Sequence, residues 1–227
     1  MIDTILFDLD DTLLDFTANE HAAITDTLSH FGIPNTRENI NRYIEINRAC
    51  WKRLECKEWT RAEVLVGRFR MLFDEFGITH DPAEAQRYYN DRLSHEGAWI
   101  DGARELLMRL RPKYRLFGVT NGNKSVQDGR ISITRIDEYL DEIFISEEIG
   151  ADKPSTEYFN AVFGKIGGGR ESCVIVGDSL TSDIQGGINA GIHTVYYNPH
   201  GYENKTGIKP EHEIGALEEL FALLERI

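Results

Sequence analysis

The stretch TILFDLDDTLLDF, residues 4–16, decides the fold because it joins a buried strand to a cluster of carboxylates. Its opening apolar run is continuous rather than alternating, which is typical of a parallel strand that helices cover on both faces. Asp8 and Asp10 follow this run directly. Alternate residues of a strand point to the same side, so both carboxylates are expected to reach one pocket. Asp11 and Asp15 are interpreted as residues that cap or solvate the turn.

Four further runs have the same buried character, and helical patterns separate them from one another. They lie at residues 114–119, 142–146, 173–177 and 193–197. Strands that alternate with helices build a doubly wound parallel sheet, so the sequence predicts an α/β fold with a Rossmann-like core. An amphipathic closing helix is expected at residues 216–226.

A long segment without a convincing strand separates the first two predicted strands. Helix-start signals lie within it, namely capping boxes at Thr17-x-x-Glu20 and Thr60-x-x-Glu63 and an Asp81-Pro82 pair. Four helices are predicted there, at residues 17–31, 36–56, 60–76 and 81–95. The sequence therefore predicts a core of residues 1–15 and 96–227, into which an all-α cap domain, residues 16–95, is inserted.

Composition and charge narrow the class of protein. The 227-residue chain has a net charge of −13, and so acidic a surface repels nucleic-acid backbones and anionic lipids. No apolar run approaches the ~20 residues of a membrane span, and the N-terminus lacks the basic region of a signal peptide. We expect a cytoplasmic monomer or weak homo-oligomer that binds a small molecule, with neither a nucleic acid polymer nor a membrane as partner. Cys50, Cys56 and Cys173 form no CxxC pair and are interpreted as reduced packing residues.

Polar residues gather where the predicted strands end, and in an open parallel sheet function gathers at these ends. Thr120-Asn121-Gly122 ends the second strand, and Asp178 and Asp183 follow the fourth. Carboxylates grouped in this way with Asp8 repel one another unless a cation lies among them. Oxygen ligands suit a hard ion, so the sequence predicts a Mg²⁺ site.

Four short motifs, in this order and near predicted strand ends, resemble those of the haloacid dehalogenase superfamily in its phosphatase branch. They are DLDDT (8–12), TNG (120–122), DKP (152–154) and GDSLTSD (177–183). The resemblance covers essentially the whole chain, and the helical insert after the first motif is similar to the helical cap of that family.

The resemblance implies roles for the acidic residues. Asp8 would be the nucleophile that forms an aspartyl-phosphate, and a free aspartate has a pKa of ~3.9, so Asp8 is expected to be ionised at neutral pH. Asp10 would protonate the leaving oxygen and later activate water. Asp8, Asp178 and the backbone carbonyl of Asp10 would bind Mg²⁺, and Asp183 would bind it through a water molecule.

The remaining motif residues would hold the phosphate. The resemblance implies that Thr120 and the amides of Asn121 and Gly122 donate hydrogen bonds to phosphate oxygens, and that Lys153 balances the negative charge. Because the motif residues are all present, a binding protein on a decayed phosphatase scaffold is disfavoured. Dehalogenases of this family lack the second aspartate of the first motif, so Asp10 also argues against dehalogenation.

Further stretches narrow the substrate. ISEEIGADKP (145–154) and SDIQGGINAGIHT (182–194) resemble the pyrimidine nucleoside 5′-monophosphate phosphatases of this superfamily, which implies a house-cleaning 5′-nucleotidase for pyrimidine (deoxy)nucleoside monophosphates. Phe16, Asn47 and Trp51 are predicted to line the nucleoside side of the cleft, because an aromatic ring stacks on a base and an amide reads its edge. The other interpretation of Trp51 is a packing residue of the cap core. A phosphatase of small sugar phosphates and a sugar-phosphate mutase stay open as alternatives.

Overall fold

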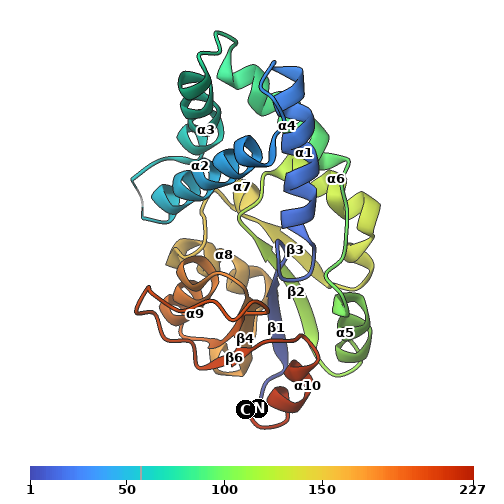
Figure 1. Ribbon diagram of the computed structural model, residues 1–227. Helices are drawn as coiled ribbons and strands as arrows, with labels where there is room; N and C mark the ends of the chain where they lie inside the picture. Colours follow the sequence, from blue (N-terminus) through green and yellow to red (C-terminus); the bar gives the residue numbers. More distant parts are fainter. Residues whose placement is uncertain (57) are drawn as a thin grey trace.

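A computed structural model describes residues 1–56 and 58–227 of the protein. Over these residues the chain forms a six-stranded parallel sheet in the order β3-β2-β1-β4-β5-β6 (Figure 1). The strands are β1 (Thr4–Asp8), β2 (Arg115–Thr120), β3 (Glu142–Ile145), β4 (Cys173–Gly177), β5 (His193–Tyr197) and β6 (His212–Ile214). The first five were predicted. The edge strand β6 was missed because its three residues are mostly accessible and carry no apolar run.

The chain order of the strands reverses beside β1. From β1 the chain runs outward to β2 and β3, and it then returns to the other side of β1 with β4, β5 and β6. Asp8 at the end of β1 pairs in register with Val119 of β2, and Phe7 pairs with Val176 of β4. The carboxyl ends of these three strands therefore meet at one edge, where the topology of an open sheet creates a crevice.

Helices cover both faces of the sheet, as the continuous apolar strands predicted (Figure 1). Ile5 and Phe7 face one core, shared with α5 (Ala103–Leu110) and α10 (Glu219–Leu224). Leu6 faces the other core, shared with α8 (Thr156–Ile166) and α9 (Gln185–Ala190). All three β1 side chains are fully buried, which fixes this strand at the centre of the molecule.

Four helices form a separate layer, here called the cap, over the carboxyl edge of the sheet (Figure 1). They are α1 (Phe16–His30), α2 (Arg37–Glu55), α3 (Arg61–Phe76) and α4 (Pro82–Ser94). Their apolar faces pack into a third core that contains Tyr43, Phe69 and Tyr89. All four were predicted to within two residues. The capping box of Thr60 and Glu63 is confirmed.

The predicted capping box at the start of α1 is wrong. Asp15 is the N-cap residue of α1, and its carboxylate accepts a hydrogen bond from the amide of Ala18 at 2.8 Å. Thr17 instead donates its amide and its hydroxyl to Asp11. Glu20, which the pattern assigned to the cap box, is buried in the cap interior.

The C-terminal helix is shorter than predicted, since α10 spans only Glu219–Leu224. Leu220 and Leu224 are buried against the sheet, so the predicted amphipathic contact is present. Both chain ends lie at the pole of the molecule opposite the cap (Figure 1). The three cysteines are free thiols. Within the described residues, every helix is too short or too polar to cross a bilayer.

Candidate active site

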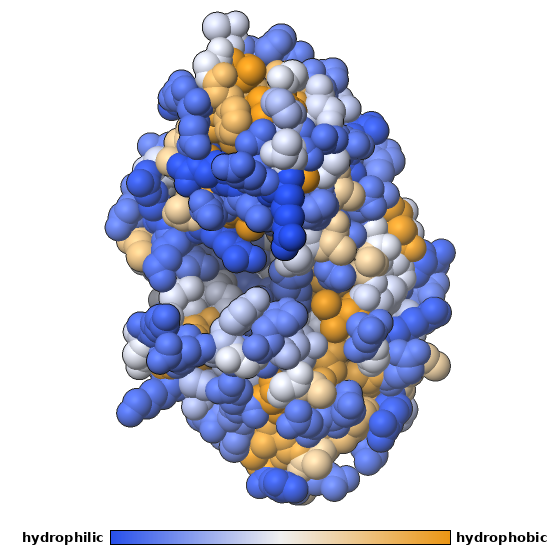
Figure 2. All heavy atoms as spheres, in the orientation of Figure 1, coloured by the Kyte–Doolittle hydropathy of each residue, from blue (hydrophilic) through white to orange (hydrophobic). Residues whose placement is uncertain are grey.

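A cavity of about 410 Å³ lies between the carboxyl edge of the sheet and the cap. Figure 2 shows the corresponding hollow in the surface, rimmed by hydrophilic side chains. Every site residue that the sequence indicated lines this one cavity. The core contributes Asp8, Asp10, Thr120, Asn121, Gly122, Lys153, Asp178 and Asp183, and the cap contributes Phe16, Asn47 and Trp51.

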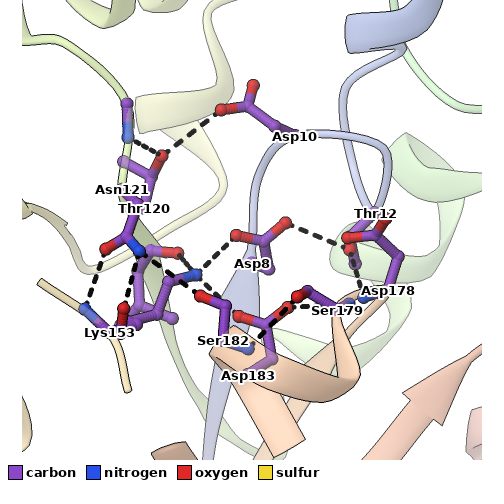
Figure 3. A network of polar contacts seen from close by, with 12 residues as sticks. Asp8, Asp10, Thr12, Thr120, Asn121, Lys153, Asp178, Ser179, Ser182 and Asp183 are labelled. Carbon is purple, nitrogen blue, oxygen red and sulfur yellow. Dashed lines mark hydrogen bonds and ion pairs between the residues drawn. The ribbon is translucent and has the colours of Figure 1, made fainter. Parts of the chain in front are cut away.

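The side chain of Lys153 points toward Asp8 and Asp183 (Figure 3). Its Nζ lies 2.6 Å from Oδ1 of Asp8 and 2.7 Å from Oδ1 of Asp183, and it donates to the carbonyl of Val119 at 2.9 Å. Burial disfavours the charged ammonium, but the carboxylates of Asp183 and Asp8 outweigh it and raise the pKa of Lys153 above its usual range. This lysine is therefore a fixed cation between two carboxylates.

Asp8, Asp178 and Asp183 form a carboxylate cluster whose ligand oxygens lie within 4.8 Å of one another. Burial raises the pKa of Asp8 to about 8, against the attraction of Lys153. Burial and the charges of Asp8 and Asp183 raise the pKa of Asp178 well above its usual range. Burial therefore opposes the ionised form of Asp8 that the sequence predicted, while the adjacent Lys153 favours it. A hard divalent ion fits this all-oxygen set and would favour the ionised form further.

The two ligand-bearing loops are tied together by Thr12 (Figure 3). Its hydroxyl donates to Oδ2 of Asp8 at 3.2 Å and accepts from the amide of Asp178 at 3.2 Å. Asp183 lies in η3 (Leu180–Ile184), a short helical turn after β4, and its Oδ2 accepts from the amide of Ser179 at 3.1 Å. Since Lys153 and Ser179 engage both oxygens of Asp183, this carboxylate is positioned to order the site.

The loop after β2 holds the lysine as well as facing the cavity. The side-chain amide of Asn121 accepts from the Lys153 amide and donates to the Lys153 carbonyl, both at 2.8 Å. The Gly122 amide donates to Oγ1 of Thr120 at 2.9 Å. A Cβ at Gly122 would lie 2.2 Å from Nε2 of Gln127, so a larger residue there would displace the Gln127 side chain.

Two residues that hold Asp10 were missed by sequence reasoning. Both come from α6 (Lys124–Thr134), the helix after β2. Arg130 forms an ion pair with Oδ1 of Asp10, and Gln127 donates to Oδ2 at 2.7 Å. Arg130 is fully buried, and its Nε and Nη2 have no hydrogen-bond partner among the described residues. The sequence could have indicated them, because Gln127 and Arg130 are three residues apart and therefore lie on the same face of the helix that follows the Thr120-Asn121-Gly122 motif.

The cap wall is more polar than the predicted pair of aromatics and one amide. Phe16 and Trp51 are partly buried and pack against the cap core, so Trp51 is both a packing residue and a cavity residue. Asn47 is 3% exposed and is bonded to Glu20 and Arg68, which also line the cavity. Neither Glu20 nor Arg68 was predicted.

The cap also contacts the core on both sides of the cavity. Arg61 of α3 donates to the carbonyls of Asn121 at 2.9 Å and Gly122 at 3.3 Å, and it forms an ion pair with Asp152. On the other side of the cavity, Thr181 donates to Glu55 of α2 at 2.6 Å. These contacts were not visible in the sequence because they join residues 60 to 126 positions apart.

Comparison with known proteins agrees with this geometry. The family model described as haloacid dehalogenase-like hydrolase matches residues 5–197. Pyrimidine 5′-nucleotidase PynA of Streptococcus pneumoniae is 38% identical, with 98% of this chain and 94% of the relative covered. Pyrimidine 5′-nucleotidase YjjG of Escherichia coli is 30% identical, with 98% and 97% covered.

A solved structure extends the comparison to the whole fold. The HAD-hydrolase YfnB of Bacillus subtilis, described as bound to magnesium and as revealing interdomain movement, superimposes with a TM-score of 0.93. It is 39% identical, and the alignment covers 100% of this chain and 99% of YfnB. Sequence motifs, cavity residues and sheet order all lead to the same assignment, and the chain belongs to the haloacid dehalogenase-like hydrolases.

Proposed function

We propose that the chain is a Mg²⁺-dependent phosphomonoesterase that acts through an aspartyl-phosphate on pyrimidine nucleoside and deoxynucleoside 5′-monophosphates. One observation carries the proposal. Lys153 joins Asp8 to Asp183 on one wall of a cavity whose opposite wall, in the cap, presents aromatic rings and buried amide and carboxyl groups. The names of the relatives PynA and YjjG support the choice of substrate. We assign residues 16–95 to a cap domain and residues 1–15 and 96–227 to the core.

In the first half of the reaction, an oxygen of Asp8 bonds to phosphorus and the bond to the ester oxygen breaks. The phosphoryl group passes to Asp8, and the electron pair leaves with the nucleoside oxygen. Lys153 keeps a positive charge beside the transferring group, and Thr120 and the loop that follows it donate hydrogen bonds. Asp8, Asp178 and the Asp10 carbonyl would hold Mg²⁺, with Asp183 acting through water, and the ion would neutralise the grouped negative charge.

Asp10 acts as the general acid in the first half of the reaction and as the general base in the second half. It gives a proton to the leaving oxygen, and it then takes one from the water that hydrolyses the aspartyl-phosphate. In the present arrangement Arg130 and Gln127 each donate to one oxygen of Asp10. We infer that one of these bonds is exchanged when Asp10 turns toward the ester.

The test is phosphate release from a panel of nucleoside monophosphates and small sugar phosphates, with Mg²⁺ and with a chelator. Asp8→Asn, which keeps the shape of the side chain without its nucleophile, is the control. We expect deoxyuridine or thymidine monophosphate to lead the panel and both controls to be silent.

Other outcomes have defined meanings. A leading sugar phosphate would overturn the substrate and leave the core chemistry in place. Movement of phosphate between two positions of a sugar without release would identify a mutase instead. Hydrolysis that survives in Asp8→Asn would overturn the aspartyl-phosphate mechanism.

A further inference from the structure

A chain of buried polar side chains runs through the cap, with one member from each cap helix. Nδ2 of Asn47 donates to Oε1 of Glu20 at 2.5 Å, and Nη1 of Arg68 donates to Oδ1 of Asn47 at 2.7 Å. Arg68 also donates to Oε1 of Gln86 from Nη2 at 2.8 Å. The four side chains are between 3% and 6% exposed.

This polar chain lies inside an otherwise apolar cap core. Its surroundings are apolar and aromatic, and the guanidinium of Arg68 lies 5.2 Å from the ring centre of Phe69 and 4.7 Å from that of Tyr89. Replacing a buried ionic network with well-packed apolar residues is often neutral or stabilising. A buried carboxyl and guanidinium that open into a cavity with catalytic groups therefore point to a ligand.

Glu20 and Asn47, which both line the cavity, keep hydrogen-bonding capacity that no described residue uses. Among the described residues, Oε2 of Glu20 has no donor, and Asn47 commits one of its two amide hydrogens to Glu20. Glu20, Asn47 and Arg68 line the cavity together with Asp8. The alcohol portion of a phosphate ester held at Asp8 and Lys153 would occupy this same cavity.

We propose that Glu20 and Asn47 read the hydrogen-bonding edge of the pyrimidine base, and that Arg68 and Gln86 hold Asn47 in the reading position. The proposal rests on the nucleotidase function proposed above. An ionised Glu20 accepts the ring N3–H of uracil or thymine, while the free Asn47 hydrogen is donated to a neighbouring base carbonyl. A protonated Glu20 instead donates to N3 of cytosine and accepts from its exocyclic amine.

Glu20 can exist in both forms near neutrality. Burial raises its pKa to about 7, against the attraction of Arg68 and the hydrogen bond from Asn47. The other charged or titratable groups that face it are Asp11 from the loop after β1, Arg48 and Tyr43 from α2, and Tyr89 from α4. Preference for uracil over cytosine should therefore rise as the pH passes through 7.

The experiment measures kcat/KM for deoxyuridine and deoxycytidine monophosphates from about pH 6 to about pH 8, on either side of the pKa of Glu20. The ratio of the two values cancels the titration of the phosphate and of the catalytic aspartates, since both substrates share them. We expect the ratio to rise roughly tenfold across this interval, as a charge-assisted hydrogen bond warrants. A ratio that is independent of pH in the wild-type protein overturns the proposal without any variant.

Glu20→Gln gives the second measurement. In this variant the ratio should be flat with pH, and the loss of kcat/KM for deoxyuridine monophosphate should exceed the loss for p-nitrophenyl phosphate by roughly tenfold. The matched control is Glu45→Gln, on the exposed side of α2, where the pH-dependent ratio should persist. Equal losses on both substrates would give Glu20 a purely structural role. If sugar phosphates were instead hydrolysed faster than nucleotides, the proposed nucleotidase function itself would be wrong.

Discussion

At the scale of single residues, the protonation of the carboxylate cluster depends on how far the positive charge of Lys153 offsets the negative charges of Asp8, Asp178 and Asp183. One buried lysine cannot neutralise Asp8, Asp178 and Asp183 together, so the cluster retains excess negative charge when all three are ionised. The raised pKa values of Asp8 and Asp178 are the consequence of this imbalance and of burial. A divalent cation bound at this cluster would thus compete with protons for the same oxygens.

This competition predicts a pH-dependent response to Mg²⁺. The folded pKa of Asp8 is raised to about 8, above that of an unfolded aspartate at ~3.9, so its contribution to stability is present at low pH and is lost as pH rises toward 8. We expect the melting temperature without metal to fall from mildly acidic to mildly basic pH. Saturating Mg²⁺ should raise it by about 5–10 °C at the basic end and by less at the acidic end.

Asp178→Asn is the control for this response. It removes one charge from the cluster, so the metal-free protein should depend less on pH and should lose most of the Mg²⁺ effect. Thermal unfolding in Mg²⁺ and in chelator measures both quantities. An undiminished Mg²⁺ shift in Asp178→Asn would place the ion elsewhere.

Arg130 is predicted to act as a positioning residue for Asp10. In Arg130→Met, Asp10 keeps only the hydrogen bonds from Gln127 and Thr120, and its carboxylate is free to turn. We expect kcat to fall about 100-fold with a much smaller change in KM, because the orientation of the proton donor changes while substrate contacts stay. The basic limb of the pH profile of kcat should move, and Arg130→Lys should recover part of the rate. A loss that falls on KM alone would contradict this role.

Residues of the site differ in how visible they are in the sequence. Asp8, Asp10, Lys153 and Asp178 could be predicted because each stands in a short motif at a strand end. Glu20 was misread as a helix cap because its spacing from Thr17 fits a capping box, whereas Asp15 takes that place in the structure. Its true partners are distant in the sequence, and only the packing of four helices brings them together.

At the scale of elements, α6 links the catalytic loop to the cap. It begins two residues after Gly122, carries Gln127 and Arg130 on its buried side, and packs against α4. Gly129 allows this contact, because a Cβ there would lie 2.2 Å from the carbonyl oxygen of Ser94. The position of α6 therefore sets both the hold on Asp10 and one side of the cap.

Gly129→Ala is predicted to destabilise the protein by about 1–3 kcal/mol, because backbone atoms must move to accept the new methyl group. Gly164→Ala, in α8, is the matched control. A Cβ at Gly164 meets nothing within 4 Å, so this change should be neutral or stabilise by about 0.5–1 kcal/mol. Urea denaturation of both variants measures the difference. Equal stability of the two variants would show that α6 and α4 are free to separate at no cost.

Helices and strands could be predicted where a short stretch of sequence alone determines them. Continuous apolar runs predicted β1 to β5, and the N-cap residues Thr60 and Asp81 predicted where α3 and α4 begin. The strand β6 has no such signal, since its pairing with β5 through only three residues creates it. The C-terminal helix was overestimated because amphipathic periodicity continues past Leu224, where the observed helix ends.

At the scale of the whole molecule, the cap closes the cavity by contacts on both rims. Arg61 reaches the loop after β2 and Asp152, the residue before Lys153, while Glu55 reaches Thr181 in η3. These core partners adjoin the residues proposed to hold phosphate and metal. Any movement of the cap relative to the core would therefore act directly on the loops that carry these residues.

The ion pair between Arg61 and Asp152 is predicted to contribute to closure. The side chains are 15% and 26% exposed, so solvent screens them less than surface pairs. A double-mutant cycle of Arg61→Ala and Asp152→Ala should give a coupling free energy of about 1–2 kcal/mol in unfolding experiments. The control is the cap-internal pair of Arg42 and Glu75, each 42% exposed, for which a smaller coupling free energy is expected because solvent screens both charges.

Measurements of kcat/KM and of hydrogen exchange in the same variants distinguish a role of Arg61 in closing the cap from a role in stability alone. If Arg61 couples the cap to the loop after β2, Arg61→Ala should lower kcat/KM for nucleotides about tenfold and speed hydrogen exchange of the Asn121 and Gly122 amides. The Arg42→Ala control should leave both unchanged, since Arg42 lies on α2 and its ion-pair partners among the described residues, Glu45 and Glu75, are both in the cap. A coupling no larger than that of the control pair, with unaltered exchange, would mean that the cap is held by its apolar contacts with α6 and that Arg61 is dispensable.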